Sequence, residues 1–440
     1  MRLGMVILTL ALPGAFRDKA ADPIDRFVQA FLGKHKIPSA AIAVVQGDRV
    51  LKLAGYGQAS VELAAPANAH TVYEIGSITK QFTAEVIMLL VGEGKLELGA
   101  PIARYLPDLP EQWQKLTVRQ LLTHTSGLPD WEGPGLLDLR REYTPAEFIQ
   151  LIASRPLDFA PGDQWAYTNS AFPLLGMVIE RVTGAAYERV VVERIFRRAG
   201  MDETRFRHPG ELVPNRAAGY LDSSGTLRNG MPLRPALLAP NGGILSTVGD
   251  LAKWALALMR GNLVNAAAFE AMTTPVTLNN GHRFNAGMAW FVDTFRRHRV
   301  LFHNGSTAAG YSSAIYLYPE DRLFVAVLLN LDRGPAVNQL ATGIAGRVVP
   351  GLSIHSLPER TEPADSMRGR LFAQLKDAPH QVDRFALLDR EDLGPMGVER
   401  FGVLVRWVYR YKLVSGVRII YYTFELGPDG KLARVASEEE

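Results

Sequence analysis

The stretch that decides the fold is YEIGSITKQFTA, Tyr73 to Ala84, where a glycine and a serine stand at the mouth of an apolar run. The residues from Thr79 to Glu93 have the apolar spacing of a helix. Residues three apart share a helix face, so Lys80 is presented to Ser77. A cation is unfavourable near the positive end of a helix dipole, so this placement needs a cause.

The segments on both sides of this helix predict one sheet. Asp22 to Lys36 has helical spacing, and two β-type runs between Ile37 and Ser60 predict a hairpin. From Thr117 to about Met259 the pattern is helices joined by long loops. Strand patterns then return, in MAWFVDTF, RVLFHNG, YSSAIYLYP and RLFVAVLLNL. We therefore predict an α+β fold, in which an antiparallel sheet is built from both ends of a domain over residues 22–350 and carries an inserted helical region.

A separate C-terminal part is predicted after this domain. Proline and charged residues cluster around Pro350 to Asp365, and we place a linker at 351–364. Beyond it, Ser366 to Leu388 reads as helical, and three β-type runs follow. These features predict a small α+β accessory domain over residues 365–440, whose expected role is packing or partner contact.

The first 21 residues have the layout of a secretory leader. One positive charge, Arg2, precedes the apolar segment Leu3 to Leu12, and Pro13 follows shortly after. We expect a signal peptide and a periplasmic or secreted protein. The alternative is an amphiphilic extension that folds back, in which case the protein is cytoplasmic. No later apolar run is long enough for a stable membrane span.

Composition excludes several classes of function. The net charge is +3, with no block of like charges, so we expect no nucleic-acid partner. There is no cysteine, and the nine histidines show no HExxH spacing, so we expect no metal and no cofactor. A small molecule or a short peptide remains as the expected substrate. The oligomeric state is left open.

Ser77 and Lys80 have a chemical interpretation and a structural one. Serine is a poor nucleophile unless a base takes its proton, and a buried lysine with a depressed pKa is such a base. The backbone N–H of Ser77 would be free at a helix start to stabilise an oxyanion. Read alone, however, S-x-x-K more often marks an N-cap followed by a solvated lysine.

Two other short motifs favour the chemical interpretation. Tyr167 and Asn169 lie in PGDQWAYTNSAF, between a Pro-Gly turn and a predicted helix. A phenol beside a lysine has its ionised form favoured and can shuttle protons. His303 ends the strand RVLFH and precedes Asn304 and Gly305, where glycine permits close approach of a substrate backbone.

The order SITK, YTN and HNG resembles the S-x-x-K, Y-x-N and K/H-x-G motifs of serine β-lactamases and penicillin-binding proteins, especially the class C branch. The strings LLTHTSGLPD and NGGILSTVGDLAKW are similar to that branch too, so the resemblance covers roughly 23–330. It implies that Ser77 forms an acyl-enzyme while Lys80 and Tyr167 move its proton. Asn169 would orient Lys80 and the substrate amide, and His303 would deliver a proton or hold a substrate group.

The resemblance also implies an oxyanion hole and a substrate-binding edge. The N–H groups of Ser77 and Ser306 would hold the oxyanion. Asn304, Gly305 and Asn241 would line the substrate, although the Asn241 loop also reads as structural.

One departure bears on the substrate. His303 stands where β-lactamases of this branch usually carry lysine, and histidine is often uncharged near neutrality. We therefore expect a serine hydrolase acting on small amides, D-amino-acid peptides or esters, as amidases, peptidases and esterases of this fold do. The alternatives are a true β-lactamase or a D-alanyl-D-alanine carboxypeptidase, and, in another class, a non-catalytic protein that binds penicillin or cell-wall peptides.

A Ser-His-Asp hydrolase is a rival interpretation, because His124 lies in LLTHTSG. No serine has the full G-x-S-x-G surround, and Ser312 in GYSSA fails at the last position. His124 and Ser126 are therefore expected to brace a loop.

Overall fold

The computed structural model describes residues 22–132, 136–232, 236–295, 298–361, 367–375, 379, 381–394, 397–400 and 403–439. The predicted leader, residues 1–21, lies outside the described residues, so its role stays a prediction. No helix among the described residues is long and apolar enough to cross a membrane.

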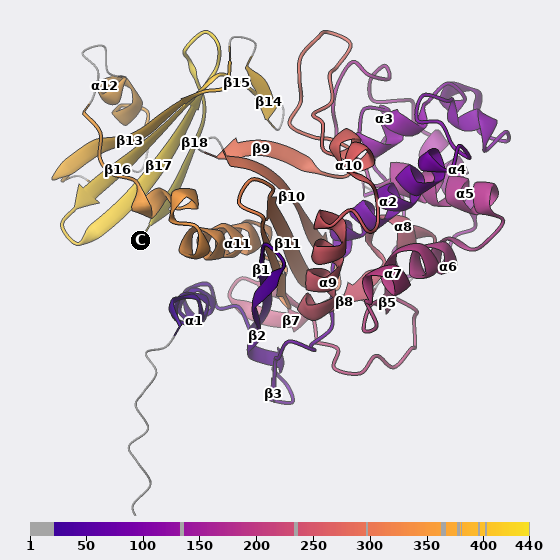
Figure 1. The fold of residues 1–440 in the computed structure, drawn as a ribbon, viewed down its shortest axis with the longest axis horizontal. Coiled ribbons are helices and arrows are strands. Elements are labelled where there is room, and N and C mark those ends of the chain that lie inside the picture. Colours follow the sequence, from indigo (N-terminus) through magenta and orange to yellow (C-terminus); the bar gives the residue numbers. More distant parts are fainter. Residues whose placement is uncertain are drawn as a thin grey trace, which may run out of the picture.

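A seven-stranded sheet forms the centre of the main domain (Figure 1), in the order β3-β2-β1-β12-β11-β10-β9. Its strands are β1 (Ser39–Gln46), β2 (Arg49–Ser60), β3 (Ala65–Pro66), β9 (Phe291–Phe295), β10 (His298–Thr307), β11 (Tyr311–Tyr318) and β12 (Leu323–Leu329). β1 pairs antiparallel with β12, so strands from the two ends of the domain lie side by side. This confirms the predicted α+β fold.

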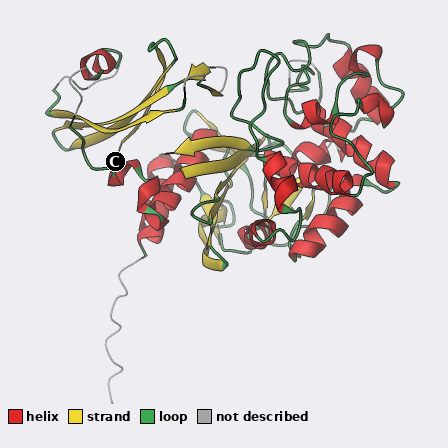
Figure 2. Ribbon diagram, turned by 45° about the horizontal axis from the view of Figure 1, so that its top comes forward, coloured by secondary structure: helices red, strands yellow, loops and turns green. Residues whose placement is uncertain are grey.

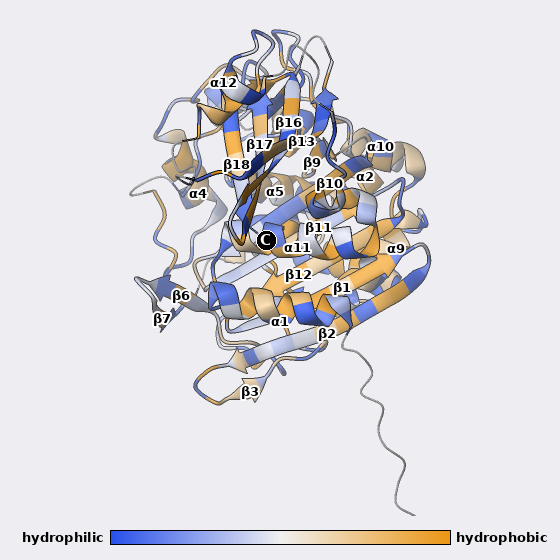
Figure 3. Cartoon of the chain, turned by 90° about the vertical axis from the view of Figure 1, so that its left-hand side faces the viewer, coloured by the Kyte–Doolittle hydropathy of each residue, from blue (hydrophilic) through white to orange (hydrophobic). Residues whose placement is uncertain are grey.

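The two faces of the sheet are covered by different helices. Alternate residues of a strand point to opposite faces. Ile42 and Val44 pack with α1 (Pro23–His35) and α11 (Gly334–Val348), whereas Ala43 packs with the inserted helical region. Figure 3 shows the hydrophobic character of β1 and β12, as expected for strands buried on both faces.

The inserted region supplies most of the helices, which gather on one side of the molecule in Figure 2. They are α2 (Thr79–Gly92), α3 (Val118–Leu122), α4 (Pro145–Ala153), α5 (Ala171–Thr183), α6 (Tyr187–Val191), α7 (Arg197–Ala199), α8 (Ala239–Gly242), α9 (Val248–Met259) and α10 (Ala266–Met272). Short strands β4 (Tyr73–Glu74), β8 (Ile244–Ser246) and β5 (Arg205–Phe206) form a second sheet, and β6 (Tyr220–Ser223) pairs with β7 (Thr226–Asn229). The helix predicted over Thr79–Glu93 is confirmed, since Glu93 is the C-cap of α2.

The C-terminal part is a four-stranded sheet with its own core. Its order is β13-β16-β17-β18, formed by β13 (Arg384–Asp392), β16 (Trp407–Ser415), β17 (Arg418–Leu426) and β18 (Leu432–Glu439). A hairpin of β14 (Val398–Arg400) and β15 (Val403–Val405) stands beside it, and α12 (Arg368–Phe372) covers one side.

The helix predicted over Ser366–Leu388 is wrong over most of its length. Among the described residues of that range only α12 is helical, and β13 begins at Arg384. Phe385 and Leu387 point into the core of the four-stranded sheet, which is the alternation of a strand. The boundary at 351–364 stays a prediction, but the segment is not a bare linker, because Ile354 and Leu357 pack against Leu388.

Candidate active site

Ser77 lies at the junction of helix α2 with strand β10. A 3-10 turn, Gly76–Ile78, leads directly into α2, and Ser77 itself is half-buried. Gly76 has a φ of 50°, and a Cβ there would lie 3.0 Å from the backbone N and O of Ser306. Glycine is therefore needed here both for the backbone conformation and for the approach of β10.

Gly305 brings the backbone of β10 up to the nucleophile from the other side. A Cβ on Gly305 would lie 2.2 Å from the carbonyl oxygen of Ile75 and 3.0 Å from the backbone nitrogen of Ser77. The two backbone segments predicted to hold an oxyanion thus meet. The side chain of Ser306 is directed elsewhere, since its Oγ donates to Asp332 Oδ1 at 2.8 Å.

Lys80 is completely buried and has three hydrogen-bond acceptors. Its Nζ donates to Ser77 Oγ at 2.9 Å, to Asn169 Oδ1 at 2.8 Å and to the carbonyl oxygen of Asn241 at 3.0 Å. Asn241 Nδ2 also donates to Asn169 Oδ1 at 3.4 Å. The predicted residues Ser77, Lys80, Asn169 and Asn241 therefore form one connected group.

The environment of Lys80 favours its neutral form. Burial lowers the pKa of Lys80 to about 7, although the charges of Asp130 and Glu132 oppose that shift. At neutral pH a large fraction of the side chain carries a free lone pair 2.9 Å from the serine hydroxyl. A neutral amine at that distance can accept the Ser77 proton.

Tyr167 corrects one expectation. Burial raises the pKa of Tyr167, and this outweighs the opposing effect of the neighbouring Ser77 hydroxyl. The phenol is therefore protonated, and the ionised form expected beside a lysine is not favoured. The negative charges of Asp130 and Glu132 add to the effect of burial, because they too disfavour the phenolate. The Tyr167 hydroxyl makes no well-formed hydrogen bond within the described part of the chain, so its proton is free for a substrate atom.

His303 is a neutral side chain in the folded protein. It is buried, and burial together with the charge of Lys80 lowers its pKa to about 3. Its Nδ1 lies 2.6 Å from the carbonyl oxygen of half-buried Asn304, which places the ring proton on Nδ1. The third motif thus supplies no fixed cation, and its ring lies 6.0 Å from that of Tyr167.

Two further side chains lie near the site: Asp130, which the sequence prediction gave no role, and His124, which it expected to brace a loop. Asp130 Oδ2 accepts two hydrogen bonds from Asn169, from the backbone N at 3.0 Å and from Nδ2 at 3.3 Å. These bonds orient the Asn169 amide so that its Oδ1 faces Lys80. His124 accepts from Thr168 N at 3.2 Å and stacks on Tyr167 at 4.5 Å. Both lie in the string LLTHTSGLPD, which carried part of the family resemblance but gave Asp130 no role.

The rival serine has structural contacts only. Ser312 is buried, and its Oγ donates to the carbonyl oxygen of Leu331 at 3.0 Å while it accepts from Arg333 N at 2.7 Å. The expectation that His124 braces a loop is confirmed by its bond to Thr168.

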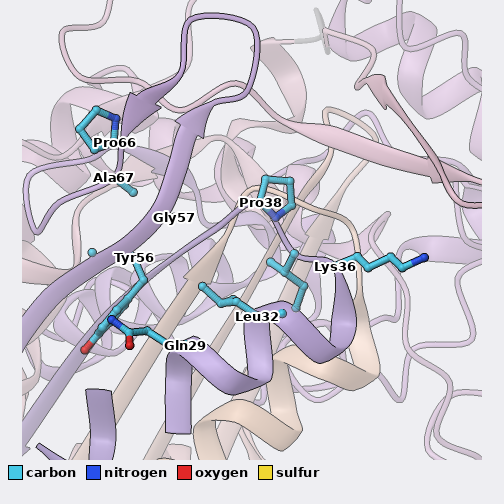
Figure 4. Close-up of a pocket in the computed structure, with 11 residues that line it drawn as sticks. Gln29, Leu32, Lys36, Pro38, Tyr56, Gly57, Pro66 and Ala67 are labelled. Carbon is cyan, nitrogen blue, oxygen red and sulfur yellow. The ribbon is translucent and has the colours of Figure 1, made fainter. Parts of the chain in front are cut away.

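A hollow on another part of the main domain is separate from this site. It has a volume of about 620 Å³ and lies between α1 and β2, where Leu32, Pro38 and Tyr56 line it (Figure 4). None of its lining residues belongs to the three motifs. Among the described residues, no group of three or more histidine, aspartate and glutamate side chains is placed to hold a metal ion.

Comparison with known families places the chain. The family model described as Beta-lactamase matches residues 24–347. The chain therefore belongs to the Beta-lactamase family, as the three motifs implied.

Relatives and solved structures agree with this assignment. A penicillin-binding protein of Bacillus subtilis (strain 168) is 28% identical over 352 residues, 76% of each chain. The D-stereospecific amidohydrolase from Streptomyces sp. is 27% identical with a TM-score of 0.62, over 73% of this chain and 97% of that one. The octameric penicillin-binding protein homologue from Pyrococcus abyssi has a TM-score of 0.65 at 24% identity, over 92% and 95%, which shows the fold. The family match and the similarity to the amidohydrolase support a serine hydrolase type of activity.

Proposed function

We propose that this protein is a serine hydrolase that forms an acyl-Ser77 intermediate with small amides, short D-amino-acid peptides or esters. The observation that carries the proposal is the 2.9 Å contact between Ser77 Oγ and a Lys80 amine whose pKa is lowered to about 7. That pair is the nucleophile and base that acyl transfer requires.

Each group then has a step. Neutral Lys80 takes the Ser77 proton as Oγ bonds to the carbonyl carbon, and the N–H groups of Ser77 and Ser306 receive the oxyanion. As the C–N or C–O bond breaks, Tyr167 gives its proton to the leaving group and regains one from Lys80. Water then attacks the acyl-serine along the reverse proton path, which regenerates the serine hydroxyl and releases the acid.

The neutral His303 favours substrates without a carboxylate at that edge. A β-lactamase or a carboxypeptidase must bind a substrate carboxylate, for which a fixed cation is suited. A histidine with a pKa of about 3 is no cation at physiological pH. Similarity to a D-stereospecific amidohydrolase points the same way. We therefore place amides and esters ahead of β-lactams and D-Ala-D-Ala peptides.

A rate panel tests this order. The unaltered protein is assayed with D-alanyl p-nitroanilide, its L-enantiomer, a short aryl ester, a chromogenic cephalosporin and a D-Ala-D-Ala peptide. We expect the ester and the D-anilide to be the fastest and Ser77→Ala to lower each rate by about 10⁴-fold or more. Intact mass spectrometry should find the acyl adduct on Ser77. If Ser77→Ala hydrolysed the substrates as fast as the unaltered protein, Ser77 would not be the nucleophile. If the cephalosporin were hydrolysed faster than the ester and the D-anilide, the protein would be a β-lactamase.

A further inference from the structure

The C-terminal domain reaches the candidate site through its hairpin. Glu399 of β14 donates its backbone N–H to the carbonyl oxygen of Arg283 at 2.9 Å and accepts from Asn285 N at 3.1 Å. These bonds form a parallel bridge between Glu399 and Phe284, in the loop before β9. The hairpin thus holds a three-residue segment of the main domain as if it were a strand.

That segment carries an aromatic side chain beneath the site. Phe284 is fully buried, and its ring stacks on Trp165 at 4.1 Å with 13° between the planes. Trp165 lies 6.5 Å from Tyr167, whose hydroxyl neighbours Ser77. Trp165 and Tyr167 are only half-buried. We call Phe284, Trp165 and Tyr167 the aromatic wall.

Buried charges fasten the hairpin to the main domain. Arg400 of β14 is 5% exposed, and it donates to Asp293 of β9 and to Glu425 of β17 at 3.0 Å. Removing one partner from a buried ionic group leaves an uncompensated charge and is strongly unfavourable. Arg400 therefore ties the hairpin to β9, next to the backbone bonds that Glu399 makes with Arg283 and Asn285.

We propose that the C-terminal domain is a specificity-determining part of the site, because its hairpin fixes Phe284 under Trp165 and so holds the Trp165 ring in place as an apolar surface for a phenyl-sized side chain of the substrate. The inference rests on the proposed function. A stacked aromatic surface that reaches solvent favours planar apolar groups. A wall held from beneath is preorganised, which lowers the cost of binding.

Arg400→Met tests the proposal, with Arg418→Met as the matched control. Arg418 is in the same domain but forms an exposed pair with Glu439. The rates with D-phenylalanyl and D-alanyl p-nitroanilide are compared. We expect Arg400→Met to lower the ratio of their kcat/KM values about tenfold, mainly through KM, and to leave kcat for the alanyl substrate within about twofold. Arg418→Met should leave the ratio unchanged.

A second variant and a second readout complete the test. If Arg400→Met does not fold by circular dichroism, Phe284→Leu decides, with the same expected loss. Binding of D-phenylalaninamide by calorimetry, in a Ser77→Ala background, needs no turnover, and Kd should rise about tenfold with either variant. If the unaltered protein hydrolyses the anilides but the variants leave both the kcat/KM ratio and Kd unchanged, the role of the aromatic wall is wrong. The proposed function would still hold. Weakened binding without any hydrolysis by the unaltered protein would support the wall and overturn the function.

Discussion

Helix α2 buries one basic and one acidic side chain, Lys80 and Glu85, which lie five residues apart. Lys80 and Glu85 are both completely buried. Lys80 Nζ lies within hydrogen-bond distance of three oxygens, those of Ser77, Asn169 and Asn241. Glu85 Oε1 accepts from Trp254 Nε1 at 3.0 Å, while Oε2 has no partner within the described residues.

Burial shifts both groups toward their neutral forms. It lowers the pKa of Lys80 to about 7 and raises that of Glu85 to about 8. Yet only Lys80 has a nucleophile beside it, whereas Glu85 faces the core next to α9. A perturbed pKa therefore does not identify an active site by itself, and the groups around it decide.

The largest expected effect separates the two residues by activity. Lys80→Met removes the base and should lower kcat/KM for an aryl ester by about 10³–10⁴-fold, because no other neutral base contacts Ser77 Oγ in the described part of the chain. Glu85→Gln, a matched change one turn further on, should leave kcat/KM within about twofold. If both variants lose activity equally, the contrast between Lys80 and Glu85 is wrong.

Glu85→Gln should instead change how stability depends on pH. The folded-state pKa of Glu85, about 8, lies above the unfolded value near 4.5. The folded state therefore binds more protons between these values, and its stability falls as pH rises through that window. Urea unfolding should show a loss of about 3–4 kcal/mol from pH 4.5 to pH 8.5 attributable to this group. The Gln variant should lack that loss, and identical slopes would contradict the buried neutral carboxyl.

The dependence of the acylation rate on pH should follow the titration of Lys80. Protonation of Lys80 below its pKa of about 7 removes the base, so the acylation rate should fall about tenfold per pH unit from pH 7 to pH 5. His303 does not contribute to this limb, because its pKa of about 3 lies below the range. Burst kinetics with the aryl ester measures the rate. An acylation rate that does not change between pH 7 and pH 5 would show that Lys80 is not the base. The same fall in rate in His303→Gln would show that the fall does not come from the histidine.

The sequence predicted the main sheet and the short motifs because their signals are local. S-x-x-K places two side chains on one helix face, and strand alternation marks which residues are buried. Strand patterns at both ends of one domain predicted a shared antiparallel sheet, although they did not specify that β1 pairs with β12. The resemblance made the order of the motifs meaningful.

The remainder depended on contacts between distant segments. The protonated state of Tyr167 is set by burial, which the sequence does not show. The same holds for the pairing of Glu399 with Arg283 and Asn285, and for the bond of Trp254 to Glu85 across helices. The predicted helix over Ser366–Leu388 extended wrongly into β13 because a short apolar run fits either period.

The smallest expected effect tests the hydrogen bond between Trp254 and Glu85. The Trp254 indole N–H stabilises the carboxylate and so lowers the pKa that burial raises. Trp254→Phe removes this donor but keeps an aromatic ring in the core. A hydrogen bond to a charged group is worth about 1.5–3 kcal/mol, so the upper end of the stability loss should move by about one to two pH units to higher pH. Urea unfolding against pH measures it, with Glu85→Gln/Trp254→Phe as the control in which no shift is expected. If the pH dependence of stability still shifted in that double variant, the shift would come from altered packing of α9. The Glu85 carboxyl would then have no part in it.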